Sequence, residues 1–194
     1  MKGGQVLPAV AYIRVIHEDE AEGKLFELYD EIQRNRGRVS NILRVHSLEP
    51  KSMRAHLDLY MTTVFAKGGL SRREVELIAV AVSGLNGDPY CTTHHKEALF
   101  RYAKDGEFVE AFARDWKGVQ LSDRERALVD YATALTRHPD KGVKAQVEAL
   151  RKLGLRDEEL LQAAQVVSYF NFANRLAIGL GVDLEPESER DYHY

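Results

Sequence analysis

The sequence predicts an all-α protein, because apolar residues recur at helical spacing along most of its 194 residues. Only five prolines are present to interrupt such a pattern. The alternation of apolar and polar residues that is typical of a β-strand is confined to residues 10–15. We therefore expect a helical bundle without a substantial β-sheet.

Two amphipathic helices are expected in the N-terminal third of the chain. Their apolar faces consist of Ala21, Leu25, Leu28, Tyr29 and Ile32 in the first helix and of Met53, Leu57, Tyr60, Met61, Val64 and Phe65 in the second. Gly68 and Gly69 then interrupt the helical pattern, and this glycine pair predicts the end of the second helix.

A further helix is expected at residues 71–85. Ser71 and Glu74 have the spacing of a capping box, in which each side chain accepts a hydrogen bond from the backbone of the other residue. After Glu76 the helix is apolar on nearly all sides, which is typical of a helix buried at the centre of a fold. We therefore expect this helix to form the middle of the protein.

A tight turn at residues 86–89 should fold the next helix back onto this one. Its sequence, Asn-Gly-Asp-Pro, contains the residue types that favour turns. Asp88 is a suitable N-cap, and Pro89 fits the first position of a helix, where its missing N–H costs nothing. The sequence therefore predicts a central helical hairpin whose second helix covers residues 89–102.

The C-terminal half is expected to contain several more helices. In order, they are a short segment at 108–112, a helix that opens with the capping box of Ser122 and Glu125 and is closed by Pro139, a helix at 143–153 ended by Gly154, and a long helix at 156–178 stopped by Gly179 and Gly181. The two capping boxes lie 51 residues apart. They could be a trace of an internal duplication, or two boxes that follow the same rule. We favour the second interpretation, since the sequences that follow them diverge.

Composition bounds the functional class. The formal net charge is −3, which gives no electrostatic reason to expect nucleic acid or an anionic membrane as partner. The single cysteine excludes an intrachain disulfide. No signal peptide and no membrane span are recognisable, so we expect a soluble, cytoplasmic protein.

We expect one domain over residues 1–194. It would contain N-terminal helices (1–69), the central hairpin (70–104), C-terminal helices (105–184) and a charged tail (185–194) that is mobile or used at a subunit contact.

The hairpin brings together side chains that suit thiol chemistry. If Asp88 is the N-cap, Cys91 lies in the first turn of its helix, where the backbone amides and the helix dipole favour the thiolate. His95 lies one helical turn further on, and His94 lies at the edge of the same face. Glu76, on the preceding helix, could approach His95 and orient its ring. The pattern is typical of an activated cysteine.

Each of these residues also has a structural interpretation. Cys91 could be an inert core residue, and Glu76 could pair with Arg72 or Arg73 instead. The carboxylate of Asp88 would oppose a thiolate beside it. The spacing of Cys91, His94 and His95 matches no zinc pattern, so we expect no metal. Spacing alone therefore leaves the reactivity of the cysteine open.

Residues 70–95 closely resemble the signature of the alkylhydroperoxidase D-like, or carboxymuconolactone decarboxylase, superfamily. That signature is a glutamate, eleven residues, Cys-x-x-Cys, three residues and a histidine, and Glu76, Asp88, Cys91 and His95 occupy its four positions without a gap. Other stretches resemble the subgroup of uncharacterised peroxidase-related enzymes, namely residues 12–15, 20–25, 41–43 and 171–176. The resemblance implies an alkylhydroperoxidase D-like helical bundle that forms a homo-oligomer, either a trimer or a hexamer.

The resemblance also implies roles for these residues. Cys91 matches the cysteine that attacks the peroxide, and His95 and Glu76 match the proton relay that activates it. Asp88 stands where the family has its resolving cysteine, so the family's internal disulfide cycle cannot run in this chain. His94, Asp88 and Tyr90 are expected to support or bind at the site, without a cofactor.

Three functions follow from these observations. The first is a thiol-dependent peroxidase-like oxidoreductase that acts on hydrogen peroxide or small organic hydroperoxides through Cys91 and is reduced by an external thiol or dithiol. The second is a decarboxylase-like lyase with histidine acid/base chemistry. The third is a non-catalytic oligomeric helical protein. Retention of Glu76, Cys91 and His95 together favours the first.

The last predicted helix contains three polar residues in an apolar run, Asn171, Asn174 and Arg175. They could line a pocket wall or a subunit contact near the site, because buried polar groups need partners. They could equally form an exposed stripe with a salt bridge at Arg175.

Overall fold

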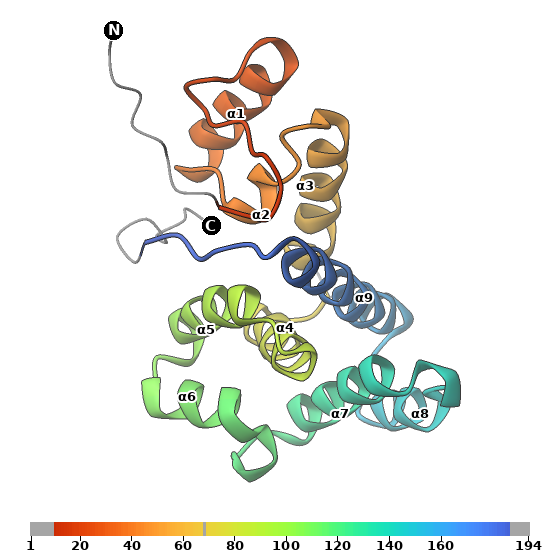
Figure 1. Ribbon diagram of the computed structural model, residues 1–194. Helices are drawn as coiled ribbons and strands as arrows, with labels where there is room; N and C mark the ends of the chain where they lie inside the picture. The colour runs from red at the N-terminus through yellow and green to blue at the C-terminus, as the bar shows by residue number, and fades with distance from the viewer. Residues whose placement is uncertain (1–9, 68, 187–194) are drawn as a thin grey trace, which may run out of the picture. The chain divides into compact units, whose positions relative to one another are not determined.

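The computed structural model describes residues 10–67 and 69–186, and Figure 1 shows its helices in order along the chain. The α-helices are α1 (Gly23–Arg36), α2 (Asn41–Arg44), α3 (Pro50–Val64), α4 (Arg72–Asn86), α5 (Pro89–Ala103), α6 (Gly106–Asp115), α7 (Asp123–Arg137), α8 (Lys144–Lys152) and α9 (Asp157–Leu180). Two 3-10 helices are η1 (Trp116–Gly118) and η2 (Pro139–Lys141). No strand occurs among these described residues, so the all-α prediction is confirmed.

Several predicted boundaries were wrong by a few residues. Helix α6 is longer than the segment expected at 108–112, since Asp105 caps it by accepting a hydrogen bond from the Phe108 amide. Helix α9 continues through Gly179 and ends only before Gly181, whose positive φ of 58° breaks the helix. The short helices α2, η1 and η2 were not predicted, because a single turn leaves no periodic pattern in the sequence.

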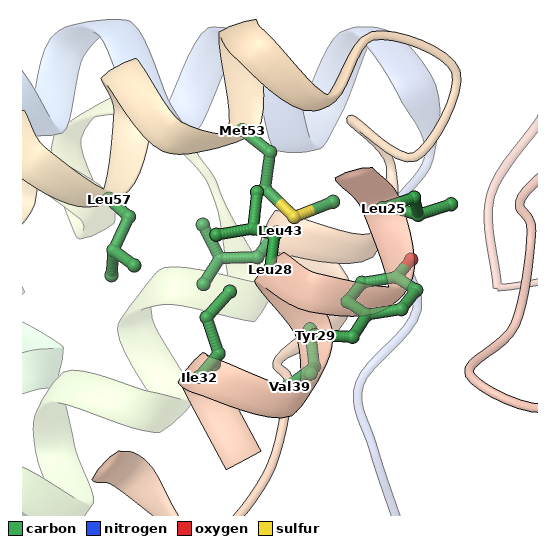
Figure 2. Packing of buried hydrophobic residues seen from close by; sticks show 8 residues of the cluster. All are labelled: Leu25, Leu28, Tyr29, Ile32, Val39, Leu43, Met53 and Leu57. Atoms are coloured by element: carbon green, nitrogen blue, oxygen red, sulfur yellow. The ribbon is translucent and has the colours of Figure 1, made fainter. Parts of the chain in front are cut away.

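The chain folds into two compact units, one made of Met1–Leu57 and Leu176–Tyr194, the other of Asp58–Arg175. The described part of the first unit has its own apolar core, which Figure 2 shows: Leu25, Leu28, Tyr29, Ile32, Val39, Leu43, Met53 and Leu57. The hydroxyl of Tyr29 leaves this core to donate a hydrogen bond to the Ile16 carbonyl at 2.8 Å. The predicted apolar faces of the first two helices therefore meet in this core. The part of the second face that follows Leu57 does not belong to the core.

The two ends of the described chain lie together in the first unit. The Tyr12 amide donates to the Leu180 carbonyl at 2.7 Å, and the Asp183 amide donates to Val10 at 3.0 Å. Glu185 is buried and accepts a hydrogen bond from the Asn41 amide at 2.5 Å. The expectation that the charged tail is mobile from residue 185 onward is thus wrong for Glu185, which a buried backbone donor fixes; residues 187–194 lie outside the described part.

Helix α4 forms the core of the second unit, as predicted. Its ten consecutive residues from Glu74 to Ser83 are all buried. Leu77, Val80 and Ala81 pack against Leu99 of α5 and Phe112 of α6. Polar residues in a helix that is buried on every side need hydrogen-bond or ion-pair partners. Glu74 and Glu76 both have such partners.

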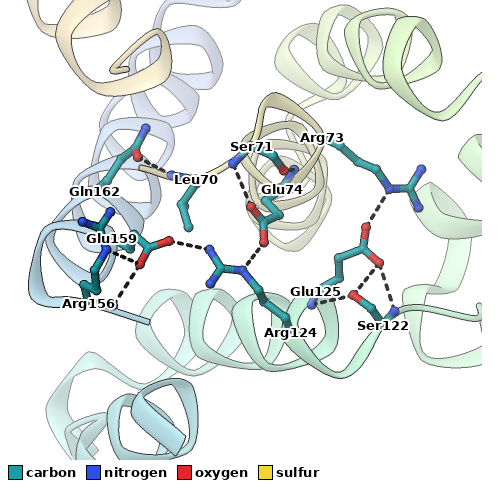
Figure 3. A network of polar contacts seen from close by, with 10 residues as sticks. All are labelled: Leu70, Ser71, Arg73, Glu74, Ser122, Arg124, Glu125, Arg156, Glu159 and Gln162. Atoms are coloured by element: carbon teal, nitrogen blue, oxygen red, sulfur yellow. Dashed lines mark hydrogen bonds and ion pairs between the residues drawn. The ribbon is translucent and has the colours of Figure 1, made fainter. Parts of the chain in front are cut away.

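The two capping boxes are joined to each other by reciprocal ion pairs (Figure 3). Arg73 Nε donates to Glu125 Oε1 at 2.6 Å, and Arg124 Nε donates to Glu74 Oε1 at 2.6 Å. The same glutamates accept from the backbone amides of Ser71 and Ser122, so each closes a box and an ion pair at once. Arg124 reaches in addition to Glu159 of α9 at 2.8 Å.

Arg124→Gln is expected to make the free energy of unfolding less dependent on pH in the acidic range. The pKa of Glu159 is lowered to about 2, first by the hydrogen bond from the Arg156 amide and next by Arg124. Because this folded-state pKa lies below that of the unfolded chain, ionised Glu159 stabilises the fold above about pH 4.5, and this contribution is lost as the pH falls toward 2. Without Arg124 the pKa moves back toward its ordinary value, so the free energy of unfolding should fall less steeply across this range.

Urea unfolding at a series of pH values measures this slope. Arg34→Gln is the control, because Arg34 pairs with Asp30 on an exposed helix face, where ion pairs contribute little. Equal slopes in the wild type and Arg124→Gln would show that Arg124 does not hold Glu159 in its charged form.

Large apolar side chains remain exposed on the second unit. They are Leu59, Met61, Phe100, Tyr102, Leu153, Leu161 and Phe172. Such surface is compatible with the expected homo-oligomer, which stays a prediction together with its size. Among the residues that the structure describes, no helix combines the length and the apolar character needed to cross a membrane.

Candidate functional site

The hairpin of α4 and α5 forms as predicted. Gly87 ends α4 with a positive φ of 69°, and the Asp88 amide donates to the Ser83 carbonyl at 3.0 Å, which reverses the chain within two residues. Asp88 is the N-cap of α5 and Pro89 its first residue. Cys91 therefore lies in the first turn of α5, and the residue is only 5% exposed.

Glu76 and His95 meet between the two helices. His95 Nδ1 lies 2.6 Å from Glu76 Oε2, and Glu76 is fully buried. A carboxylate at this distance accepts the Nδ1 proton, which leaves the lone pair of the neutral ring on Nε2. The edge of the ring packs against Phe170 of α9, with ring centroids 4.5 Å apart. The imidazole is thus fixed in one orientation and can act as a base through Nε2.

Arg72 holds the other oxygen of the same carboxylate. Its guanidinium pairs with Glu76 Oε1 and also donates from Nη1 to the Val64 carbonyl at 2.5 Å. It lies over the ring of Phe65, 4.0 Å from the centroid. The sequence left open whether Glu76 approaches His95 or pairs with Arg72 or Arg73. Its two oxygens bind both His95 and Arg72, whereas Arg73 pairs with Glu125. Spacing of four residues between Arg72 and Glu76 on one helix was the signal for this contact.

Asp88 is a structural residue of the site. Its Oδ1 accepts the Tyr90 amide at 3.0 Å, and its Oδ2 accepts from Asn174 Nδ2 at 2.8 Å. Asn174, fully buried, also donates to Ser83 Oγ at 3.0 Å and accepts from Asn86 Nδ2 at 2.9 Å. Two donors thus share the charge of the carboxylate, which weakens its opposition to a thiolate nearby.

Helix α9 contributes residues whose place the sequence left open. Asn174 is buried behind the hairpin turn, so the stripe predicted on this helix is not wholly exposed. Arg175 is exposed and donates to the carbonyl and side-chain oxygens of Asn171 at 2.7 and 2.8 Å. Among the described residues, Arg175 forms no ion pair with an acidic side chain, so the salt bridge that the sequence suggested is not found in this part of the chain.

The remaining predicted residues line α5. Tyr90 and His94 are buried, with ring centroids 4.6 Å apart. Cys91 and His95 lie four residues apart, and therefore on one face of the helix. In residues 10–67 and 69–186, no group of three or more histidine, cysteine or acidic side chains is arranged to hold a metal ion.

Comparisons with known proteins agree with this fold and hairpin. Residues 50–115 match the carboxymuconolactone decarboxylase family. The chain is similar to a crystal structure of an alkylhydroperoxidase AhpD core, an uncharacterized peroxidase-related protein from Ralstonia eutropha JMP134, with 26% identity, a TM-score of 0.83 and coverage of 93% of this chain and 95% of that one. An uncharacterized peroxidase-related protein from Silicibacter sp. TM1040 has 25% identity, a TM-score of 0.84 and coverage of 95% and 97%.

A more distant structure shares the fold alone. The debrominase Bmp8 is 19% identical, with a TM-score of 0.74 and coverage of 93% of each chain. The search of curated proteins gave no match. The family match spans α3 to α6, including the whole hairpin, and the two peroxidase-related structures extend the likeness over more than nine-tenths of the chain. Residues 50–115 therefore match the carboxymuconolactone decarboxylase family, and the chain has the fold of alkylhydroperoxidase D-like proteins.

Proposed function

We propose that this protein is a thiol-dependent peroxidase-like oxidoreductase that reduces hydrogen peroxide or small organic hydroperoxides through Cys91. The observation that carries the proposal is the buried chain of contacts from Arg72 through Glu76 to His95, which ends one helical turn from the cysteine. A histidine that served packing alone would not need a buried carboxylate behind it that is itself paired with a half-buried arginine. This series of contacts suits a histidine base that must repeatedly gain and lose a proton.

In the proposed first step, Nε2 of His95 takes the proton of the Cys91 thiol. The thiolate attacks one peroxide oxygen, so that an S–O bond forms while the O–O bond breaks. The leaving alkoxide or hydroxide takes the proton back from the His95 imidazolium and departs as alcohol or water. The sulfur is oxidised to a sulfenic acid and the peroxide is reduced, while Glu76 stabilises the transient charge on the ring.

The return step needs thiols from outside the chain, because Cys91 is its only cysteine. A first external thiol attacks the sulfenic sulfur and releases water, which leaves a mixed disulfide. A second thiol attacks that disulfide, restores the Cys91 thiol and departs as an external disulfide. With only 5% of Cys91 exposed, small peroxides are favoured over bulky ones.

Trapping of the sulfenic acid tests the proposal. Wild-type protein is given a brief pulse of hydrogen peroxide in the presence of dimedone, and the modified peptide is located by mass spectrometry. We expect an adduct at Cys91 and none in Cys91→Ser. If the wild-type thiol reacts with peroxide no faster than the amino acid cysteine at the same pH, the proposal fails. Turnover that survives in Cys91→Ser would favour histidine acid/base chemistry instead.

A further inference from the structure

The helices α7 and α8 repeat the arrangement of α4 and α5. Helices α4 and α7 both have 15 residues, and their N-caps Ser71 and Ser122 lie 51 residues apart. The reciprocal ion pairs of Figure 3 follow the same offset, since Arg73 corresponds to Arg124 and Glu74 to Glu125. In each ion pair, the arginine of one helix pair contacts the glutamate of the other. This reciprocal pattern is the one expected of two copies related by an approximate two-fold axis.

The offset extends beyond the first helix of each pair. The 3-10 helix η2 (Pro139–Lys141) falls where α5 has its first turn, and α8 (Lys144–Lys152) falls where α5 continues. Duplication, the interpretation of the two capping boxes that we did not favour from sequence, thus has structural support.

The second copy lacks the chemical groups of the first. At an offset of 51 residues, Glu76 corresponds to Ala127, His95 to Gln146 and Cys91 to Gly142. His94 corresponds to Ala145. The copy therefore has neither the acid, the base nor the thiol, and alanine or glycine stands at three of these four positions.

A groove opens at this place. Its volume is about 510 Å³, within the range of sites for small molecules, and Ala127, Ala145 and Gln146 all line it. Ala134 and Ala149 add to its apolar wall, and Trp116 contributes an aromatic ring. The smallness of the alanines is what leaves the space, since helices of longer side chains would close it.

Polar groups in the groove favour an anion. Lys117, Arg137 and His138 line it against a single carboxylate, that of Asp130. Neither Lys117 nor Arg137 forms an ion pair with an acidic side chain among the described residues. Thr133 also lines the groove, and its buried Oγ1 has no hydrogen-bond partner among the described residues.

We propose that the groove between α7 and α8 is a binding site for a small organic carboxylate with an apolar body. The carboxylate lies toward Arg137 and Lys117, and its apolar part lies on the alanine wall beside Trp116. Planar guanidinium groups bind carboxylates through two parallel hydrogen bonds, so Arg137 is the main contact for the ligand's carboxylate. The site requires neither Cys91 nor peroxide, so it stands or falls independently of the proposed function.

Trp116 is the only tryptophan of the chain and reports directly on the groove. Benzoate is titrated into the wild-type protein while tryptophan fluorescence is followed. Benzyl alcohol is the matched control, with the same ring and no charge. We expect a saturable change with benzoate and at least threefold weaker binding of the alcohol. Absence of saturation with benzoate, or equal binding of both compounds, would overturn the proposal.

Three variants locate the site. Ala134→Leu fills the groove and should abolish the saturable change, while Arg137→Gln should weaken benzoate binding by about threefold to tenfold. Arg34→Gln removes the same charge from an exposed helix outside the groove and should bind as the wild type does. Circular dichroism checks that each variant is folded. Wild-type affinity in folded Ala134→Leu or Arg137→Gln would contradict the assignment.

Discussion

Exchange of His95 for alanine is expected to slow the reaction of Cys91 with hydrogen peroxide by about 100- to 10,000-fold, the usual contribution of a positioned general base. The ring is held by Glu76 at 2.6 Å and packed against Phe170, so its orientation for proton transfer is fixed. The rate is measured as the loss of titratable thiol after mixing with excess peroxide. His94→Ala is the comparison, because His94 contacts Tyr90 and should affect the rate much less.

The residues behind His95 should act through it. Glu76→Gln keeps the size of the side chain but removes the charge that stabilises the imidazolium, so the rate should fall by about tenfold or more. Arg72→Gln should change the dependence of the rate on pH more than its maximum, since Arg72 only positions Glu76. Wild-type rates in both His95→Ala and Glu76→Gln would mean that the contacts between Glu76 and His95 have only a structural role.

Local motifs account for the part of the site that could be predicted from sequence. The capping box of Ser71, the turn at Gly87 and the N-cap Asp88 fix the hairpin, and the hairpin alone brings Glu76 to His95 across 19 residues. Each of these signals acts over a few residues and follows from backbone hydrogen bonding. The family signature and the geometry agree for this reason.

The contributions of α9 could not be predicted, because its apolar residues leave no clear face. Asn174 lies 91 residues from Ser83 and 86 from Asp88, and only packing decides which side of α9 meets α4. A polar residue in an apolar helix shows that partners exist but does not name them. The groove escaped prediction for a similar reason, since alanines are as common in closed helix contacts as in open ones.

Asn174→Ala is expected to lower the free energy of unfolding by about 2–4 kcal/mol, because a buried charged group loses a hydrogen-bond partner. Asn174 is fully buried and joins Ser83, Asn86 and Asp88, so its loss leaves the Asp88 carboxylate with one donor fewer in a buried place. Removing one partner of a buried charged group costs more than the hydrogen bond itself contributes. Urea unfolding at neutral pH gives the value.

The Asp88→Ser variant separates the role of Asp88 as the N-cap of α5 from the role of its negative charge. Serine can still accept the Tyr90 amide as an N-cap but presents no carboxylate to Asn174. If the two side chains are coupled, Asn174→Ala should cost about 1–2 kcal/mol less in the Asp88→Ser background than in the wild type. Equal costs in the two backgrounds would show that Asn174 stabilises the helices without Asp88. A measured coupling would mean that the residue at the position of the family's first cysteine serves to attach the hairpin turn to α9.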